Sequence, residues 1–468
     1  MKAEKGIAPP RERLGWVLIV GSLLTVLQCY WIVVAEAMWF SIHLTVQSIF
    51  FTAVFALVVL MLFNAGLRAV RRNLAFSRQE LLLLYVMMCM GAAMAGHGFM
   101  QLLIPLMGHA HWYASPENDW AELILPRLPE WLVVSDPQAL RDHYLGGSTF
   151  YTSEHLRVWL RPIFWWTLFI FAFVLVQLGL NLLVRRQWVE QEKLTYPIIQ
   201  LPLELIEQPV GLIRNPLFWG GFGIAAGLSL WNQLSILFPS VPYVHLKLTD
   251  IGRYFREKPW NAVGWLPISF YPFAIGLGYF IPLDLLFSSW FFYLFWKAQR
   301  VLMTVAGVSA RGGSFSGFQG IIEQSTGAYL AVGITALWAT RRHFRGVWAA
   351  LWRRPGAVEE QGEPLSYRTT VTMTLFAFLF LIGFSVRAGM SLWLAVPFFL
   401  IYFLITFSIV RMRAEMGGPG ARYAQRRSGS DLSAAAGDSE DRAAEPDDHG
   451  PVLVLQPSAL FGLCAGAA

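Results

Sequence analysis

The stretch LGWVLIVGSLLTVLQCYWIVVA, residues 14–35, decides the class of this fold. It contains no charged side chain over about 20 residues, the length that an α-helix needs to cross the hydrocarbon core of a bilayer. Lipid offers no hydrogen-bond partner to exposed backbone groups, so such a stretch crosses as a helix. We therefore expect an integral membrane protein with this segment as its first span.

Composition extends this conclusion to the whole chain. Of its 468 residues, 56% are hydrophobic and 14% are charged, whereas about a quarter are charged in an ordinary soluble protein. Further apolar runs of span length occur at 44–63, 164–184, 216–238 and 371–386, and spans are also predicted at 327–340 and 391–410. The formal charge of +6 is gathered in short clusters at the ends of such runs, a pattern of membrane topology. The expected partner is the lipid bilayer and not nucleic acid.

Basic clusters also orient the predicted helices, because Lys and Arg concentrate in cytoplasmic loops. Clusters at 68–72, 185–186, 341–345 and 411–413 alternate with poorly basic loops. We expect an all-α, polytopic bundle of about ten spans in the cell (inner) membrane, with broken helices and both termini in the cytoplasm. The predicted parts are spans one to three in 1–108, an extracytoplasmic segment at 109–161, spans four to ten in 162–413 with a broken-helix region at 267–297, and a disordered cytoplasmic tail at 414–468.

Polar residues within the third predicted span form a candidate site. An ionisable side chain at bilayer depth costs roughly 2.5–3.5 kcal/mol on insertion scales. In MCMGAAMAGHGFMQ, residues 88–101, the small residues Gly91, Ala95 and Gly98 allow another helix to approach closely. His97 and Gln101 are four residues apart and would share one helix face. They either pack against a neighbouring helix or line a path for a solute or proton.

Three further acidic positions lie at or near the ends of predicted spans. Glu36, together with His43, flanks the first turn between spans and is interpreted as an interfacial polar group. Asp284 follows Pro282 at a predicted helix break, where it either caps a helix or faces a site between two half-helices. Glu323, with Gln324 beside it, follows a Gly/Ser-rich stretch and either starts a helix or lines a cavity.

Enzyme and cofactor motifs are absent from the sequence. It contains no GxSxG, HExxH or GxxxxGK[ST] motif. The three cysteines lie far apart and form no CxxC pair, so neither a disulfide framework nor a cysteine metal site is expected. We expect no cofactor and no metal site.

The turn after the fourth predicted span carries a resemblance to a known family. Residues 192–197, EKLTYP, follow a basic helix end and precede an apolar segment, and Pro197 and Pro202 are expected to break the helix there. This turn resembles that of the oligopeptide transporter family, above all its yellow-stripe-like branch, which carries metal chelates. Segment 73–96 is similar to the family's third span, which begins with an acidic residue. Segment 276–295 is similar to the family's helix that glycine and proline interrupt. Ile198, Ile199 and Gln200 depart from the small residues that the family has after the proline.

The resemblance, together with broken helices and polar residues in spans, favours a secondary transporter. Such a protein would move a small peptide-like or metal-chelate-like solute by alternating access, with protons as the coupling ion, and could act as a homo-oligomer. The expected path residues are His97, Gln101, Tyr196, Asp284, Glu323 and Gln324. One alternative is a membrane-embedded enzyme or assembly factor that uses carboxylates in the 109–161 segment. Another is a structural membrane subunit without transport of its own.

Overall fold

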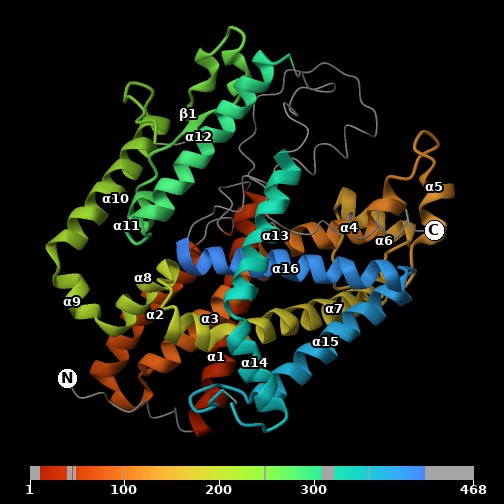
Figure 1. The fold of residues 1–468 in the computed structure, drawn as a ribbon, viewed down its shortest axis with the longest axis horizontal. Coiled ribbons are helices and arrows are strands. Elements are labelled where there is room, and N and C mark those ends of the chain that lie inside the picture. Colours follow the sequence, from red (N-terminus) through yellow and green to blue (C-terminus); the bar gives the residue numbers. More distant parts are fainter. Residues whose placement is uncertain are drawn as a thin grey trace.

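The computed structural model of the chain is almost entirely helical (Figure 1). It describes residues 11–39, 45, 49–96, 98–246, 249–307, 321–356 and 358–416. The first group of elements is α1 (Arg11–Val33), the π-helix η1 (Val34–Met38), α2 (Phe51–Val70), η2 (Arg72–Leu74), α3 (Arg78–Ala95) and α4 (Met100–Trp112). The second group is α5 (Trp120–Leu123), η3 (Leu125–Arg127), α6 (Pro137–Leu145), α7 (Ser153–Arg186), the π-helix η4 (Gln187–Gln191), α8 (Pro197–Glu207), α9 (Pro209–Arg214) and α10 (Pro216–Leu237).

The rest of the described chain contains its two short strands and six further α-helices. In order these are β1 (Thr249–Asp250), η5 (Gly252–Tyr254), η6 (Trp260–Val263), β2 (Pro267–Ile268), α11 (Pro272–Tyr279), α12 (Leu283–Val305), α13 (Ile321–Ala339), α14 (Arg341–Leu351), α15 (Tyr367–Arg387) and α16 (Leu392–Met416). Strands β1 and β2 pair antiparallel, with Thr249 opposite Ile268. The predicted tail lies outside the described residues from position 417 onward.

Six helical segments of the described chain are long and apolar enough to cross a membrane. They are Arg13–Met38, Phe51–Val70, Arg78–Trp112, Ser153–Gln191, Tyr367–Arg387 and Leu392–Met416. Their length and hydropathy confirm the prediction of a helical protein suited to a membrane. Helices α10 and α13 coincide in position with two further predicted spans, at 216–238 and 327–340.

A first core joins α1, α2, α3 and α8. Helices α1 and α3 begin at the same end, because Arg13 Nε on α1 lies 3.6 Å from Glu80 Oε1 on α3. A Cβ atom at Gly91 of α3 would collide with Thr25 of α1. This contact confirms the predicted close helix approach at Gly91. Ile206 of α8 is buried with residues of all three helices, so α8 belongs to this first core.

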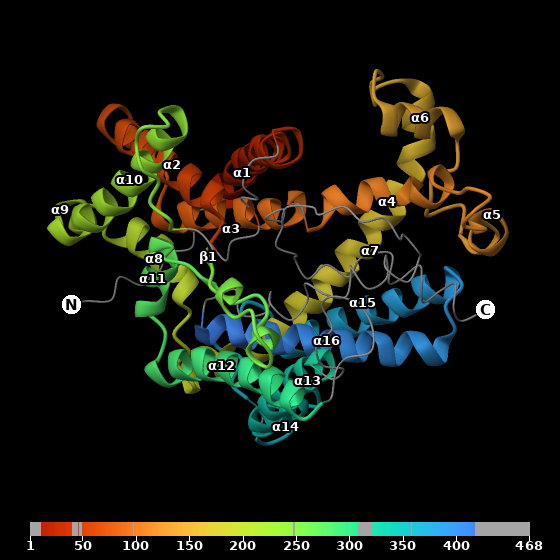
Figure 2. The ribbon, with the colours of Figure 1, turned by 90° about the horizontal axis from the view of Figure 1, so that it is seen from above.

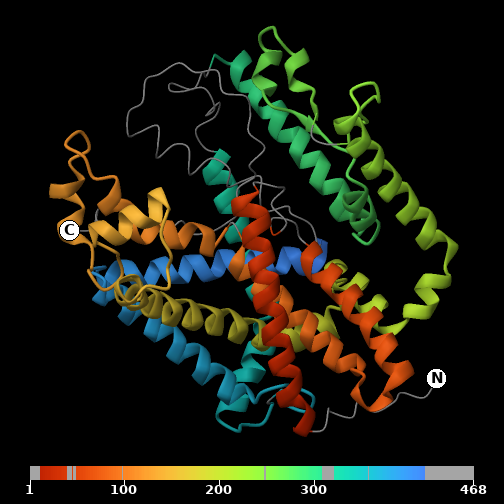
Figure 3. The ribbon, with the colours of Figure 1, turned by 180° about the vertical axis from the view of Figure 1, so that it is seen from behind.

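A second core joins α4, α7, α15 and α16, which Figure 1 shows lying alongside one another. Its aromatic centre includes Phe169 on α7, whose ring centroid is 5.0 Å from that of Phe384 on α15. Helices α7 and α15 pack so closely that a Cβ atom at Gly179 would overlap Thr374. Figure 3, seen from behind, shows α1 (red) crossing in front of α16 (blue).

Residues 113–152, here called the cap segment, close one end of the second core. Figure 2 shows its helices α5 and α6 at the far end of the molecule from α9 and α10. The backbone N–H of Val134 donates to the Met107 carbonyl oxygen at 2.9 Å. The Tyr144 hydroxyl donates to the Pro105 carbonyl oxygen at 2.5 Å. These bonds attach the cap segment to α4.

Two predicted helix interruptions have different outcomes. The break expected at Pro282 is confirmed, because α11 ends at Tyr279 and α12 begins at Leu283. With eight residues, α11 rises only about 12 Å, which is too short to cross a hydrocarbon core of about 30 Å. The two spans expected at 267–297 are therefore not two full-length helices. Pro202, also expected to break a helix, lies inside α8 and does not end it.

Candidate functional site

The third span-length segment is interrupted at residues 96–99. Helix α3 ends at Ala95, and its C-cap Gly96 has extended backbone angles of φ −66° and ψ 161°. Helix α4 resumes at Met100 after Phe99, whose φ of −136° and ψ of −88° are not helical. An interruption of this kind frees backbone groups inside a membrane helix, and other protein groups must then satisfy them. Breaks in spanning helices are where membrane carriers place solute and ion sites.

A buried carboxylate lies beside this break. Glu36, on the π-helix η1, is only 2% exposed. Its Oε1 accepts hydrogen bonds from the backbone N–H of Thr45 at 2.7 Å and from the Thr45 hydroxyl at 2.9 Å. Its Oε2 accepts a hydrogen bond from the side-chain amide of Gln101 at 3.2 Å. The carboxylate therefore links the end of α1, the loop before α2 and the start of α4.

Gln101 holds the two sides of the break together. Its amide nitrogen also donates to the carbonyl oxygen of Ala95 at 3.0 Å, one of the carbonyls left without an intrahelical partner at the end of α3. Gly96 lies against Thr45, since a Cβ atom there would be 2.5 Å from the Thr45 hydroxyl oxygen. We call Glu36, Thr45, Gly96 and Gln101 the Glu36 site.

Helix lengths place the Glu36 site near one boundary of the membrane. The 18 residues of α3 rise about 27 Å from Arg78 to the break, and Glu36 lies about 35 Å from Arg13 along α1. Both values approach or exceed the thickness of the hydrocarbon core, about 30 Å. This depth fits the interfacial interpretation of Glu36. Its burial and its three donors do not fit a group that merely faces water or headgroups.

The predicted partnership of His97 and Gln101 rested on one continuous helix. In the structure α3 ends at Ala95 and α4 begins at Met100, so the continuous helix on which this prediction depended is not present. His97 itself lies outside the described residues. Gln101 still belongs to a polar cluster, although its partner there is Glu36.

Tyr196 lies in the turn between η4 and α8, against the end of α16. Its backbone N–H donates to the carbonyl oxygen of Ala414 at 2.8 Å. The neighbouring Thr195 hydroxyl donates to the carbonyl oxygen of Glu415 at 2.8 Å. Tyr196 has a left-handed φ of 44°, a strained backbone for a residue with a Cβ atom. The turn thus satisfies two of the last carbonyls of α16.

An ion pair reinforces the same turn. Arg411 of α16 pairs with Glu192, and its guanidinium carbon lies 5.3 Å from the centroid of the Trp188 ring. Burial raises the pKa of the Tyr196 hydroxyl, although the positive charge of Arg411 acts in the opposite direction. These contacts give the EKLTYP turn a structural role in joining α7, α8 and α16.

The other predicted path residues lie elsewhere. Asp284 is exposed on the first turn of α12, where a negative charge is favourable near a helix N-terminus. Gln324 is exposed on α13, and Glu323 lies on the first turn of the same helix. In the described part of the chain, no hydrogen bond joins Asp284 or Gln324 to the Glu36 site. The structure therefore does not bring the predicted path residues together.

Two carboxylates of the cap segment, Asp136 and Asp142, have structural partners. Asp136 caps α6 by accepting the backbone N–H of Ala139 at 2.8 Å. Asp142 Oδ2 lies 3.0 Å from Nε2 of His155. Burial lowers the pKa of the His143 imidazole, so this side chain favours its neutral form. Across the described residues, no group of three or more His, Cys, Asp or Glu side chains is placed to hold a metal ion.

Sequence reasoning missed Glu36 as a buried group, although a signal for it exists. Thr25, Gln28 and Ile32 recur at helical spacing and therefore lie along one face of α1, and Glu36 follows at the same spacing on η1, which continues α1. Gln28 is 4% exposed and donates to the Thr52 hydroxyl at 3.0 Å, so this face is turned to the protein and not to lipid. Gln28 precedes Glu36 by eight positions on the same face, and this pairing of a polar residue with an acid was the indication of a buried site.

The chain belongs to a family of unknown function, DUF6785, whose sequence model matches residues 8–429. This range includes every residue of the Glu36 site and the whole EKLTYP turn. No curated protein and no solved structure gives a significant match to the chain.

Proposed function

We propose that this protein is a secondary membrane transporter that moves a small solute by alternating access, with protons as the coupling ion. The observation that carries the proposal is the buried carboxylate of Glu36 at a break in a spanning helix. A buried acid in a membrane protein is costly to keep and is commonly part of a solute or proton path. Carriers form such sites at discontinuous helices near the bilayer midplane, and the Glu36 site shares the helix discontinuity, although it lies near one boundary of the membrane.

The division into two cores supports a mechanism of relative movement. The first core contains α1, α2, α3 and α8, and the second contains α4, α7, α15 and α16. The chain passes between them at the 96–99 break and again at the 192–196 turn. Rocking of one core against the other would change the access to the Glu36 site. Protonation of Glu36 would weaken its bonds to Thr45 and Gln101, which links proton binding to this movement.

The solute class rests on the resemblance to oligopeptide transporters. Small peptides and metal chelates carry carboxylate and amine groups, which an acid and an amide such as Glu36 and Gln101 can bind. We therefore propose a peptide-like or chelate-like solute. The test is a screen of di- and tripeptides and of metal chelates for uptake into proteoliposomes that contain the purified protein. If none of these compounds is taken up under an imposed proton gradient, this solute class is contradicted.

We further propose about ten spans in the inner membrane, with both termini in the cytoplasm. The support is that the 192–196 turn bonds to the end of α16, while α8 packs on α2 and α3. These contacts bring the basic ends of α3, α7 and α16 to one side of the bundle, as the positive-inside rule requires.

Reporter fusions test this topology. A reporter fused after Arg72 or Arg345 is expected to stay in the cytoplasm, because both positions follow basic clusters. A reporter after Pro116, in the cap segment, is expected to be exported. Export of the reporter at Arg345 would contradict the proposed arrangement of the spans after α12.

A further inference from the structure

Helix α14 presents an exposed stripe of arginine and tryptophan. Arg341, Arg345, Trp348 and Trp352 follow one another at helical spacing and lie on one face. Both tryptophans are 60% exposed, and their ring centroids are 6.2 Å apart. Tryptophan and arginine together are typical of a helix that lies at the level of lipid headgroups.

The opposite face of α14 is fixed to the bundle. His343 is buried, and its Nε2 donates to the Leu183 carbonyl oxygen on α7 at 2.7 Å. Val347 is buried with Leu183 and with Tyr367 of α15. Helix α14 begins two residues after α13 ends and is followed by α15, one of the helices of span length. It therefore lies where the bundle meets the membrane boundary.

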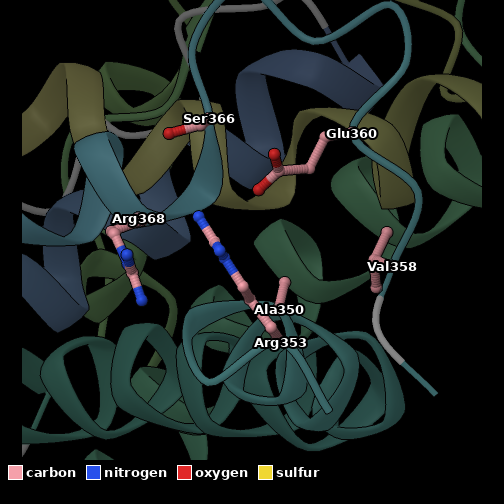
Figure 4. Close-up of a pocket in the computed structure, with 6 residues that line it drawn as sticks. All are labelled: Ala350, Arg353, Val358, Glu360, Ser366 and Arg368. Atoms are coloured by element: carbon pink, nitrogen blue, oxygen red, sulfur yellow. The ribbon is translucent and has the colours of Figure 1, made fainter. Parts of the chain in front are cut away.

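A hollow of about 310 Å³ opens at the end of α14. Its lining residues are Ala350, Arg353, Val358, Glu360, Ser366 and Arg368 (Figure 4). Figure 4 shows the side chains of Arg353 and Arg368 extending into the same space, with the Glu360 carboxylate on its other side. Arg368 donates to the Leu351 carbonyl oxygen at 2.9 Å, and Glu360 accepts the backbone N–H of Tyr367 at 3.1 Å.

Arg353 is held in an unusual conformation at this hollow. Its φ of 50° is left-handed, and it stands just after α14, where helices commonly end on a glycine. An arginine in this position strains the backbone. Among the described residues, its guanidinium forms no hydrogen bond or ion pair. A strained backbone that presents an unpaired cation to a hollow indicates a binding role.

We propose that this hollow binds the phosphate of an anionic phospholipid headgroup. Arg353 and Arg368 supply the guanidinium donors, whose fork geometry matches phosphate oxygens. The Ser366 hydroxyl caps α15 by accepting the backbone N–H of Thr369 at 3.2 Å and can donate its own proton to the phosphate. The negative charge of the Glu360 carboxylate repels anions, so it favours the singly charged phosphate diester of a lipid over a more highly charged anion. The Trp348 and Trp352 side chains place the acyl chains of the lipid beside α14. This neighbouring stripe is the reason to assign the phosphate to a lipid and not to a free anion.

Lipid retention by the purified full-length chain tests the proposal. The protein is extracted, mixed with phosphatidylglycerol or phosphatidylcholine, washed in detergent and examined by native mass spectrometry. We expect phosphatidylglycerol to be retained and phosphatidylcholine to be lost. Arg353→Gly and Arg368→Gln should each lower the retained phosphatidylglycerol about five-fold. Arg127→Gln, an exposed arginine of the cap segment, serves as the matched control and should retain it fully.

Two further measurements make the outcome decisive. Arg353→Gly relieves the left-handed strain, so its melting temperature without lipid should equal or exceed that of the wild type. A loss of lipid in this variant is then not a loss of fold. The proposal is overturned if Arg353→Gly and Arg368→Gln retain phosphatidylglycerol like the wild type. It is equally overturned if inorganic phosphate displaces the lipid completely, which would show a site for free anions, or if phosphatidylcholine is retained as well.

Discussion

Replacing Glu36 with leucine is expected to lower the free energy of unfolding by on the order of 3 kcal/mol. Leucine fills a similar volume but accepts no hydrogen bond. The backbone N–H and hydroxyl of Thr45 and the amide of Gln101 would then lose their acceptor inside the protein. A buried donor left without a partner costs about 1–3 kcal/mol. Reversible unfolding in mixed detergent micelles measures the loss.

Two variants control this experiment. Glu36→Gln keeps one acceptor oxygen and should lose less than half as much stability as Glu36→Leu. Glu122→Leu changes an exposed acid of the cap segment and should stay within about 0.5 kcal/mol of the wild type. Equal stability of Glu36→Leu and Glu122→Leu would show that the hydrogen bonds around Glu36 do not hold the fold.

Replacing Gly96 with valine is expected to lower both stability and transport. The backbone angles at Gly96 are open to any residue, so the effect does not come from conformational strain. It comes from overlap, because the new Cβ atom would lie 2.5 Å from the hydroxyl oxygen and 2.7 Å from the Cβ atom of Thr45. Overpacking of this kind costs about 1–3 kcal/mol. Displacement of Thr45 would also remove two bonds to Glu36 and lower solute uptake about ten-fold or more.

Gly66→Val is the matched control for this change. Gly66 lies on α2, where an added Cβ atom meets no atom within 4 Å. Its replacement by valine should leave stability and uptake close to those of the wild type. If Gly96→Val and Gly66→Val behave alike in both assays, the contact between Gly96 and Thr45 has no part in the site.

The spans were predictable because they depend on local composition. A long apolar run must form a helix in lipid wherever it occurs, and α1, α7, α15 and α16 follow the predicted runs. The break at Pro282 was predictable for a similar reason, since proline removes a backbone donor at its own position. Close packing at Gly91 also followed from the sequence, because small residues admit a neighbouring helix.

The Glu36 site was not predictable in the same way. Residues 96–99 contain no proline, and their glycines are Gly96 and Gly98. Gly98 was interpreted as a site of close helix packing, although glycine also commonly ends a helix. The break is stabilised by contacts from distant positions, above all Thr45 against Gly96 and Gln101 against Glu36. The docking of Tyr196 on the end of α16 likewise joins residues that are more than 200 positions apart. Such long-range contacts leave no mark in the spacing of a single sequence.

The two proton-site hypotheses differ in their key residue. The sequence predicts Asp284 as one of several path residues, whereas we assign proton coupling to Glu36, which is buried while Asp284 is exposed. Glu80 offers a matched control, because it is also 2% exposed but forms a capping box with Ser77 at the start of α3. Glutamine can replace glutamate in a capping box, so Glu80→Gln should leave the fold and its function intact.

Solute-driven proton uptake in proteoliposomes, followed with an internal pH-sensitive dye, tests the central claim most directly. Once the solute screen has supplied a substrate, the wild type, Glu80→Gln and Asp284→Asn should all take up protons with the solute. Glu36→Gln should insert into the vesicles in equal amount but show no solute-driven proton uptake. Proton uptake by Glu36→Gln at the wild-type rate would contradict the account, and its loss in Asp284→Asn instead would move the coupling site to the start of α12.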